Sequence, residues 1–150
     1  MKIPDTIGVV LENKQVRTVL SIAPERTVYE ALVKMAEHDV GALLVISDDE
    51  LVGIVSERDY ARKCILAGHP SRTTEVREIM TSPVFSVSPQ QTVDECLTLM
   101  TEHHFRHLPV VEDDEVVGLV SIGDLVKWVI SGQAHHIETL EGYIAGAYPG

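Results

Sequence analysis

Aromatic side chains and cysteines are both scarce in this chain. Phe, Tyr and Trp together make up 5% of the 150 residues, whereas hydrophobic residues as a whole make up 45%. The core must therefore be aliphatic, built from Val, Ile, Leu and Met. The two cysteines, Cys64 and Cys96, lie far apart and form no CxxC pair. We interpret them as buried free thiols of a protein in a reducing compartment.

Basic residues and long apolar runs are also few. Twelve Lys and Arg stand against 23 Asp and Glu, for a formal net charge of -11. Nonspecific nucleic-acid binding needs Lys and Arg to neutralise phosphates, so a general DNA or RNA binder is disfavoured, although a local basic pocket stays open. No apolar stretch approaches the roughly 20 residues that cross a bilayer, and no signal peptide begins the sequence. We expect a cytoplasmic protein without a membrane partner.

The chain does contain an internal repeat, because it matches itself without gaps at an offset of 65 positions. So many identities in one register indicate a tandem duplication. Matching pairs include Thr27 with Thr92, Glu30 with Glu95, Met35 with Met100, Gly53 with Gly118, Ser56 with Ser121 and Asp59 with Asp124.

Each copy predicts the order strand, helix, strand, strand, helix. A Thr begins the first helix, with a Glu three residues later as a capping box. Two Val- and Ile-rich runs around an acidic turn predict a hairpin. The fold class is therefore α/β (α+β), each repeat being a small sheet with two packed helices. The predicted strands are 19–22, 42–46 and 51–55, then 84–87, 108–111 and 116–120, and the helices that close the copies are 56–67 and 121–130.

The flanking segments complete the predicted organisation. Short helices are expected at 4–13 and 75–80, and Ile137, Leu140 and Ile144 predict a C-terminal amphipathic helix that packs on a second subunit or on the repeats. The predicted division is an N-terminal helical segment at 1–16, the first repeat at 17–68, a linker at 69–79, the second repeat at 80–131, and a C-terminal helix and tail at 132–150.

The motifs Gly-Ile-Val-Ser-Glu-Arg-Asp at 53–59 and Gly-Leu-Val-Ser-Ile-Gly-Asp at 118–124, with Met-Thr at 80–81 and Arg-His-Leu-Pro-Val-Val at 106–111, resemble the cystathionine-beta-synthase (CBS) domain. The resemblance covers residues 5–131. It implies a pseudo-twofold pair of repeats, called a Bateman module, that often forms a homodimer. Its clefts would bind AMP, ADP, ATP, an NAD-type dinucleotide or S-adenosylmethionine. Small bacterial-type signal-transduction members look most similar, and adenine nucleotides are their usual ligands.

Ser56 and Ser121 lie where a strand passes into a helix. Free N–H groups and partial positive charge at a helix start can receive a phosphate, and a Ser hydroxyl can donate to a phosphate or ribose. Asp59 and Asp124 follow three residues later, and an ionised Asp accepts from ribose hydroxyls. The same Ser-x-x-Asp pattern is also a helix cap. Both interpretations can hold together.

The two copies differ in their basic residues. In the repeat alignment, Arg58 of the first copy matches Gly123 of the second. Arg106 and His107 of the second copy match Gly41 and Ala42 of the first. The resemblance implies that Arg106 and His107 face the nucleotide phosphates, a role that suits the Arg fork. A solvated Arg and a half-buried His are the alternative.

The strand positions around these residues also differ. Leu44 stands where the second copy has Pro109, so we expect one strong site and one weaker site. The resemblance further implies that Ser21, Thr81 and Val84 border the adenine. These residues could instead belong to the core.

We therefore predict a non-catalytic, adenine-nucleotide-binding regulatory protein, a homodimer that signals to an unidentified protein partner. The alternative is a protein-interaction and dimerisation module with vestigial clefts, and a nucleotide-processing enzyme is a third hypothesis. The His pairs lack the i, i+4 spacing of a helical metal site, so no metal site is predicted. The predicted ligand residues are Ser21, Ala42, Ser56, Arg58, Asp59, Thr81, Val84, Arg106, His107, Pro109, Ser121 and Asp124.

Overall fold

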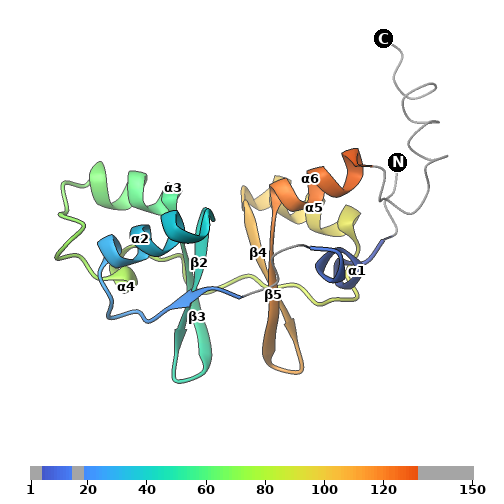
Figure 1. The fold of residues 1–150 in the computed structure, drawn as a ribbon, viewed down its shortest axis with the longest axis horizontal. Helices are drawn as coiled ribbons and strands as arrows, with labels where there is room; N and C mark the ends of the chain where they lie inside the picture. Colours follow the sequence, from blue (N-terminus) through green and yellow to red (C-terminus); the bar gives the residue numbers. More distant parts are fainter. Residues whose placement is uncertain (1–4, 15–18, 132–150) are drawn as a thin grey trace, which may run out of the picture. The chain divides into compact units, whose positions relative to one another are not determined.

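The computed structural model describes residues 5–14 and 19–131, which fall into two compact units (Figure 1). The first-repeat unit is Val19–Phe85, and the second-repeat unit joins residues 5–14 to residues 86–131. The linker after the first repeat thus belongs to the first-repeat unit. The predicted C-terminal helix lies outside the described residues. No helix in the described ranges has the length and apolar character needed to span a bilayer.

The first-repeat unit packs its helices beside a three-stranded sheet of order β1-β2-β3 (Figure 1). β1 runs parallel to β2, and β2 pairs antiparallel with β3. The mixed α/β class and the order of elements predicted for this copy are confirmed. Its elements are β1 (Ser21–Ile22), α2 (Val28–His38), β2 (Ala42–Ser47), β3 (Glu50–Ser56), α3 (Glu57–Asp59), the π-helix η1 (Tyr60–Ile65) and α4 (Val76–Ile79).

The second-repeat unit repeats this arrangement closely. Its hairpin has the same register as the first, with His107 opposite Ser121 where Ala42 lies opposite Ser56. The register shifts at the equivalent place in both hairpins, between Val45 and Ile46 and between Val110 and Val111. Its elements are α1 (Ile7–Glu12), α5 (Val93–His103), β4 (His107–Glu112), β5 (Glu115–Ser121) and α6 (Ile122–Ile130).

The strand predicted at 84–87 is reduced to a single parallel bridge between Val87 and Val110. In the first copy, the Leu44 N–H donates to the Leu20 carbonyl at 3.1 Å. Pro109 occupies the matching position and has no N–H to donate. The bonds that remain join the Val87 N–H to the Pro109 carbonyl and the Val111 N–H to the Val87 carbonyl. The prediction of a full strand was therefore wrong because of one proline.

The helix predicted at 56–67 forms, but most of it is a π-helix. Only Glu57–Asp59 are α-helical before η1 begins. The Leu66 N–H donates to the carbonyl of Ala61, five residues earlier, at 3.2 Å. The equivalent segment of the second copy is the regular helix α6. π-turns are frequent near functional sites.

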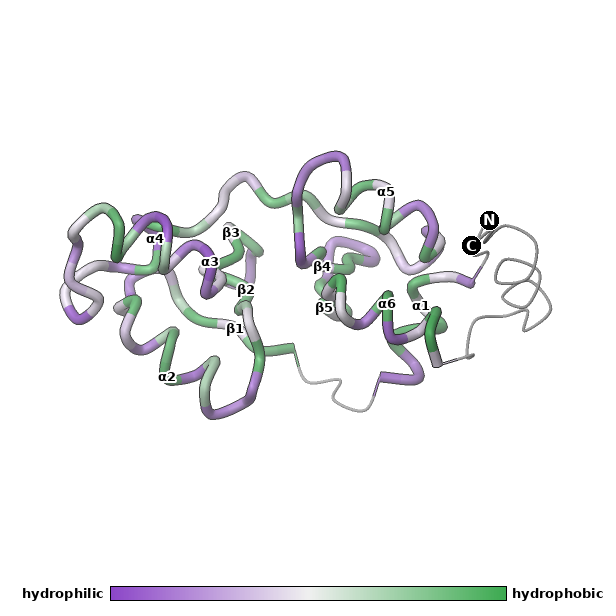
Figure 2. Tube along the Cα trace, turned by 90° about the horizontal axis from the view of Figure 1, so that it is seen from above, coloured by the Kyte–Doolittle hydropathy of each residue, from purple (hydrophilic) through white to green (hydrophobic). Residues whose placement is uncertain are grey.

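Each unit has its own largely aliphatic core, as the scarcity of aromatic residues predicts, although Trp128 is buried in that of the second-repeat unit. Figure 2 shows apolar and polar residues alternating along α2 and α5, so each helix has one apolar face. Cys64 and Cys96 are free and buried, and burial raises the pKa of the Cys96 thiol to about 11, with a contribution from Glu95. Fully buried core residues include Val28, Leu43, Val45 and Val76 in the first-repeat unit and Ile7, Val93, Leu108 and Leu125 in the second.

Capping boxes begin the long helices at the predicted residues. The Thr27 hydroxyl accepts from the Glu30 N–H at 3.1 Å, and the Glu30 carboxylate accepts from the Thr27 N–H at 3.2 Å. This backbone hydrogen bond lowers the pKa of Glu30 below its ordinary value. Thr92 and Glu95 make the same pair of bonds. Two of the orphan donors at each helix start are thereby satisfied.

A short helical segment closes each unit, and both segments bind through the same three backbone hydrogen bonds. The first-repeat unit is closed by α4, and the second by α1, which precedes the first repeat in the sequence. The bonds run from Val28, Val76 and Arg77 N–H to Thr74, Arg26 and Pro24 carbonyls, and from Val93, Ile7 and Gly8 N–H to Asp5, Gln91 and Pro89 carbonyls.

The closing segments lie directly on two matching strand glycines. A Cβ added to Gly53 would lie 2.6 Å from the Met80 sulfur and 3.2 Å from the Thr81 carbonyl oxygen. A Cβ added to Gly118 would lie 2.8 Å from Leu11 Cδ2. Glycine is therefore required here by close approach of the closing segment. In the second-repeat unit, the Trp128 indole N–H also donates to Asp5 at 2.9 Å.

Replacing Gly53 with Ala should destabilise the protein by about 1–3 kcal/mol, because the new methyl group overpacks against Met80 and a backbone carbonyl. Urea unfolding followed by circular dichroism measures this change. Gly123→Ala is the control, since its Cβ would meet only the Ser121 hydroxyl at 3.6 Å. That variant should be as stable as the parent or slightly more stable. Equal stability of the two variants would contradict the close packing at Gly53.

Candidate functional site

Ser56 caps the helix that follows β3, and three hydrogen bonds, two through its hydroxyl and one through its backbone N–H, join it to Asp59. The Ser56 hydroxyl accepts from the Asp59 N–H at 3.1 Å. The Ser56 N–H and the Ser56 hydroxyl both donate to Asp59 Oδ2, each at 3.0 Å. The predicted cap therefore forms, and it fixes the orientation of the carboxylate.

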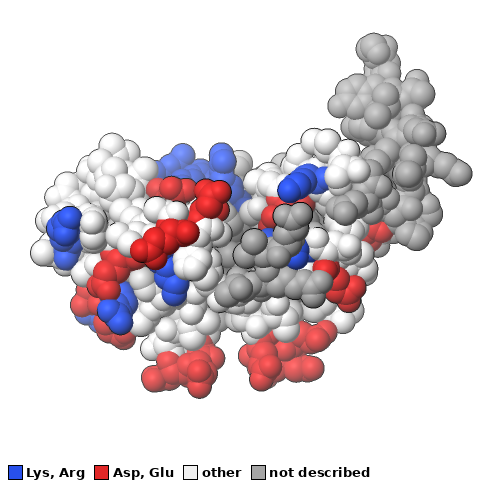
Figure 3. All heavy atoms as spheres, in the orientation of Figure 1, with Lys and Arg blue, Asp and Glu red and all other residues white. Residues whose placement is uncertain are grey.

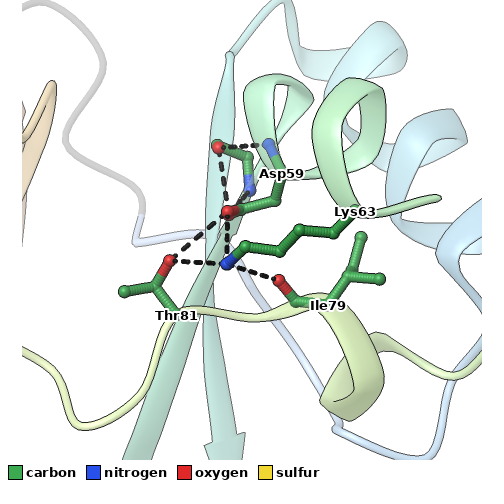
Figure 4. Close-up of polar contacts among 5 residues, drawn as sticks. Asp59, Lys63, Ile79 and Thr81 are labelled. Carbon is green, nitrogen blue, oxygen red and sulfur yellow. Dashed lines mark hydrogen bonds and ion pairs between the residues drawn. The ribbon is translucent and has the colours of Figure 1, made fainter. Parts of the chain in front are cut away.

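The other oxygen of Asp59 binds the closing segment and a lysine (Figure 4). The Thr81 hydroxyl donates to Asp59 Oδ1 at 3.3 Å, and Lys63 Nζ lies 3.0 Å from the same oxygen. Lys63 Nζ also donates to the Ile79 carbonyl at 3.2 Å. Ser56, Asp59 and Thr81, three of the predicted ligand residues, thus lie in one hydrogen-bonded network.

The second copy repeats the cap with a different lysine. The Ser121 hydroxyl accepts from the Asp124 N–H at 3.0 Å, and the Ser121 N–H donates to Asp124 Oδ2 at 2.9 Å. Lys14 Nζ lies 2.9 Å from Asp124 Oδ2 and donates to the Leu119 carbonyl at 2.8 Å. A cation from the segment before the first repeat therefore reaches the carboxylate of the second.

Arg106 and His107 lie at the same end of the hairpin as this cap. His107 is paired with Ser121 across the two strands, and the Arg106 carbonyl accepts from the Ile122 N–H at 2.9 Å. The Arg106 residue is exposed and His107 is half-buried. Arg106 immediately before β4 and His107 at its first position thus lie beside the start of a nine-residue helix.

The remaining predicted residues lie in or next to the sheets. Ser21 is in β1 opposite Leu44, and the buried Ala42 pairs with Ser56. Arg58 and Val84 are half-buried, and Pro109 is buried within β4. Seven of the predicted residues belong to the first-repeat unit and five to the second: Ser21, Ala42, Ser56, Arg58, Asp59, Thr81 and Val84, and then Arg106, His107, Pro109, Ser121 and Asp124.

The two lysines were not among the predicted ligand residues. Lys63 follows Asp59 by four residues in the sequence, so an i, i+4 ion pair was a usable signal. Lys14 is 110 positions from Asp124, and no local pattern joins them. The internal repeat was no guide either, because the two lysines come from different parts of the repeat unit.

Negative charge gathers at the hairpin turns, at the opposite end of each hairpin from the Ser-Asp caps (Figure 3). The turns contain Asp48 and Asp49 in one unit and Asp113 and Asp114 in the other, all with positive φ. A six-residue strand separates each turn from its cap, a distance of about 17 Å. This exceeds the Debye length of about 8 Å at physiological ionic strength. The capped ends are therefore screened from the negative charge of these turns.

Histidines, cysteines and carboxylates do not assemble into a metal-binding group within residues 5–14 and 19–131. No cluster of three such side chains occurs in those ranges. The site chemistry described above is that of hydrogen-bond donors, carboxylates and cations.

The sequence profile of the CBS domain matches residues 14–65 and 76–131, and the chain therefore belongs to the CBS domain family, with two copies in tandem. The resemblance predicted from the sequence motifs is confirmed. Tandem CBS proteins of this kind are regulatory rather than catalytic, and CBS domains commonly bind adenine nucleotides.

Several known proteins are similar over most of the chain. CBSX3, a mitochondrial CBS domain-containing protein of Arabidopsis thaliana, is 42% identical over 127 residues, which cover 81% of this chain and 62% of CBSX3. This chain thus spans less than two thirds of that relative. YhcV of Bacillus subtilis is 34% identical over 77% of this chain and 82% of its own length. The solved structure of a Burkholderia ambifaria protein with CBS domains has a TM-score of 0.83 at 48% identity, covering 88% of this chain and 98% of that one.

Replacing Ser56 or Ser121 with Ala should lower the free energy of unfolding by about 0.5–2 kcal/mol, because each hydroxyl satisfies a helix-start N–H. The loss should be larger for Ser56, whose hydroxyl also donates to Asp59. Urea denaturation of both variants measures the difference. Thr98→Ala is a suitable control, since the exposed Thr98 hydroxyl donates to the Asp94 carbonyl at 3.0 Å within α5 and satisfies no helix-start N–H. An unchanged stability in both cap variants would contradict the capping geometry.

Proposed function

We propose that this protein is a non-catalytic regulatory protein that binds an adenine nucleotide. The observation that carries the proposal is the group formed by Ser121, Asp124, Arg106 and His107 at one end of the second hairpin. It combines a helix start, a carboxylate that can accept hydroxyl protons and two basic side chains. This is the set of groups that a ribose phosphate requires.

The roles of these residues follow from their hydrogen-bonding capacity. Asp124 accepts from the ribose hydroxyls, because an ionised carboxylate only accepts. Arg106 and His107 bind phosphate, for which the guanidinium fork is well shaped. In the first-repeat unit, Ser56, Asp59 and Thr81 form the matching ribose group, with Arg58 as its cation. Ser21, Ala42 and Val84 would border the adenine bound by the first-repeat unit, and Pro109 would border the adenine bound by the second.

The charge distribution supports an anionic ligand despite the net charge of -11. The acidic turns lie about two Debye lengths from the caps along each hairpin. Lys14 and Lys63 further offset the carboxylates of the site. A nucleotide phosphate at the capped end therefore meets little repulsion from the turns.

The regulatory step we propose is a population shift. A nucleotide that binds one arrangement of the repeats better than another biases the protein toward it. A partner protein then responds to that arrangement, and a homodimer in the cytoplasm is the proposed form. AMP, ADP, ATP and NAD all carry the adenosine phosphate that these residues would bind.

Calorimetric titration with AMP, ADP, ATP, NAD and S-adenosylmethionine tests the proposal, once carried-over ligand has been removed. We expect at least one of them to bind, and Asp124→Ala to weaken that binding about tenfold or more through loss of charged hydrogen bonds. Glu95→Ala is the matched control, since Glu95 holds the same capping-box position at the start of α5. Absence of binding by all five compounds would contradict the proposal and favour the protein-interaction module.

A second variant tests the phosphate role of Arg106. Replacing Arg106 with Ala should weaken AMP binding about tenfold, the effect of losing a charged hydrogen bond, while adenosine binding stays the same. Arg77→Ala, which removes an exposed arginine on α4, is the control. An equal loss of AMP and adenosine affinity would show that Arg106 acts on the fold and not on the phosphate.

A further inference from the structure

We infer that the two cap carboxylates are unequal: Asp124 is open to a ribose diol, whereas Asp59 is held closed by Thr81 and Lys63. The inference rests on the proposed function and states which of the two copies binds the nucleotide with the higher affinity. It follows from counting the acceptor positions that each carboxylate has left. An ionised carboxylate offers about four lone-pair positions, two on each oxygen.

Asp59 has all of these positions filled from within its own unit. Oδ2 accepts from the Ser56 N–H and the Ser56 hydroxyl, both at 3.0 Å. Oδ1 accepts from the Thr81 hydroxyl at 3.3 Å and pairs with Lys63 at 3.0 Å. A ribose hydroxyl can bind this carboxylate only by displacing one of these donors (Figure 4).

The Asp124 carboxylate keeps half of its hydrogen-bond acceptor positions. Its two partners, the Ser121 N–H and Lys14 Nζ, both bind Oδ2, each at 2.9 Å. Within residues 5–14 and 19–131, no donor binds Oδ1. Two acceptor positions therefore remain, which is the number that the 2′- and 3′-hydroxyls of a ribose need.

Exposure differs in the same direction. The Asp59 side chain is 12% exposed and that of Asp124 is 25% exposed. The carboxylate with unused acceptor positions is thus also the more accessible one. No ion pair has to break before a ligand reaches its free oxygen.

The difference arises from how the two closing segments end. In the first-repeat unit, α4 ends at Ile79 and the chain continues along β3, where Thr81 exchanges two backbone bonds with Ile54. This register brings the Thr81 hydroxyl onto Asp59. In the second-repeat unit, the Leu119 carbonyl, which matches that of Ile54, accepts from the Lys14 side chain. Within the described residues, the Lys14 side chain thus takes the place that the Thr81 backbone has in the first-repeat unit, and no threonine hydroxyl binds Asp124.

The chain should accordingly have one high-affinity site. AMP and 2′-deoxy-AMP are suitable probes, because they differ only in a hydroxyl that the open carboxylate would accept. We expect wild-type protein to bind one AMP per chain and to prefer AMP over 2′-deoxy-AMP by about tenfold or more. Asp124→Asn should abolish this preference, whereas Asp59→Asn should retain it. Both replacements are isosteric, and thermal unfolding verifies that each variant is folded.

Other outcomes separate the inference from the proposed function. Loss of the preference in Asp59→Asn with retention in Asp124→Asn would overturn the inference while nucleotide binding still stood. Two equal sites, or equal affinity for the two probes, would overturn it as well. Failure of wild-type protein to bind AMP, ADP, ATP, NAD or S-adenosylmethionine would instead overturn the proposed function itself.

A double variant tests the closed state of Asp59 directly. Thr81→Val with Lys63→Met removes both donors from Oδ1 while keeping the side-chain volumes similar. The calorimetric stoichiometry for AMP should then rise from one to two per chain. Lys127→Met is the control, because it removes an exposed lysine on α6 and should leave the stoichiometry at one. A folded double variant that still binds one AMP would overturn the role assigned to Thr81 and Lys63.

Discussion

Each repeat depends on the close approach of a helical segment to a strand glycine. In both units a short helical segment joins the repeat through three backbone hydrogen bonds. Gly53 and Gly118 allow that segment to lie directly on the strand. Because the segment passes beside the Ser-Asp cap, the contact that completes the core also decides what surrounds the carboxylate.

The two copies show how a duplicated site can diverge without a change in its central residues. Ser and Asp are the same in both copies, and the cap distances agree within a few tenths of an ångström. The difference lies in what surrounds these residues. Thr81 of the closing segment and Lys63 of η1 both bind Oδ1 of Asp59, whereas no donor within the described residues binds Oδ1 of Asp124. The surroundings of a carboxylate can therefore differ between two copies whose Ser and Asp are identical.

Much of the fold could be predicted from the sequence, because the same residue pattern occurs in both copies and each helix and hairpin is therefore predicted twice independently. The caps at Thr27 and Ser56 carry local hydrogen bonds, and local patterns identify them. The shortened strand at Val87 was not predicted, although Pro109 is evident in the sequence. Proline lacks an N–H, but which neighbouring strand loses a hydrogen bond depends on the register of the hairpin. The contact between Lys14 and Asp124 could not be predicted, because it joins residues far apart in the sequence through a fold that only packing determines.

The position of α1 in the sequence, before the first repeat although it packs in the second-repeat unit, also sets an order for folding during synthesis. Residues 19–85 are contiguous, so the first-repeat unit has all its parts once Phe85 leaves the ribosome. Residues 5–14 are made first, yet they bind a unit whose last helix ends at Ile130. At typical translation rates, the apolar side chains of Ile7 and Val10 wait on the order of ten seconds for their partners. Although α1 is synthesised before both repeats, its apolar face is thus buried only after α6, the last helix of its unit, has been made.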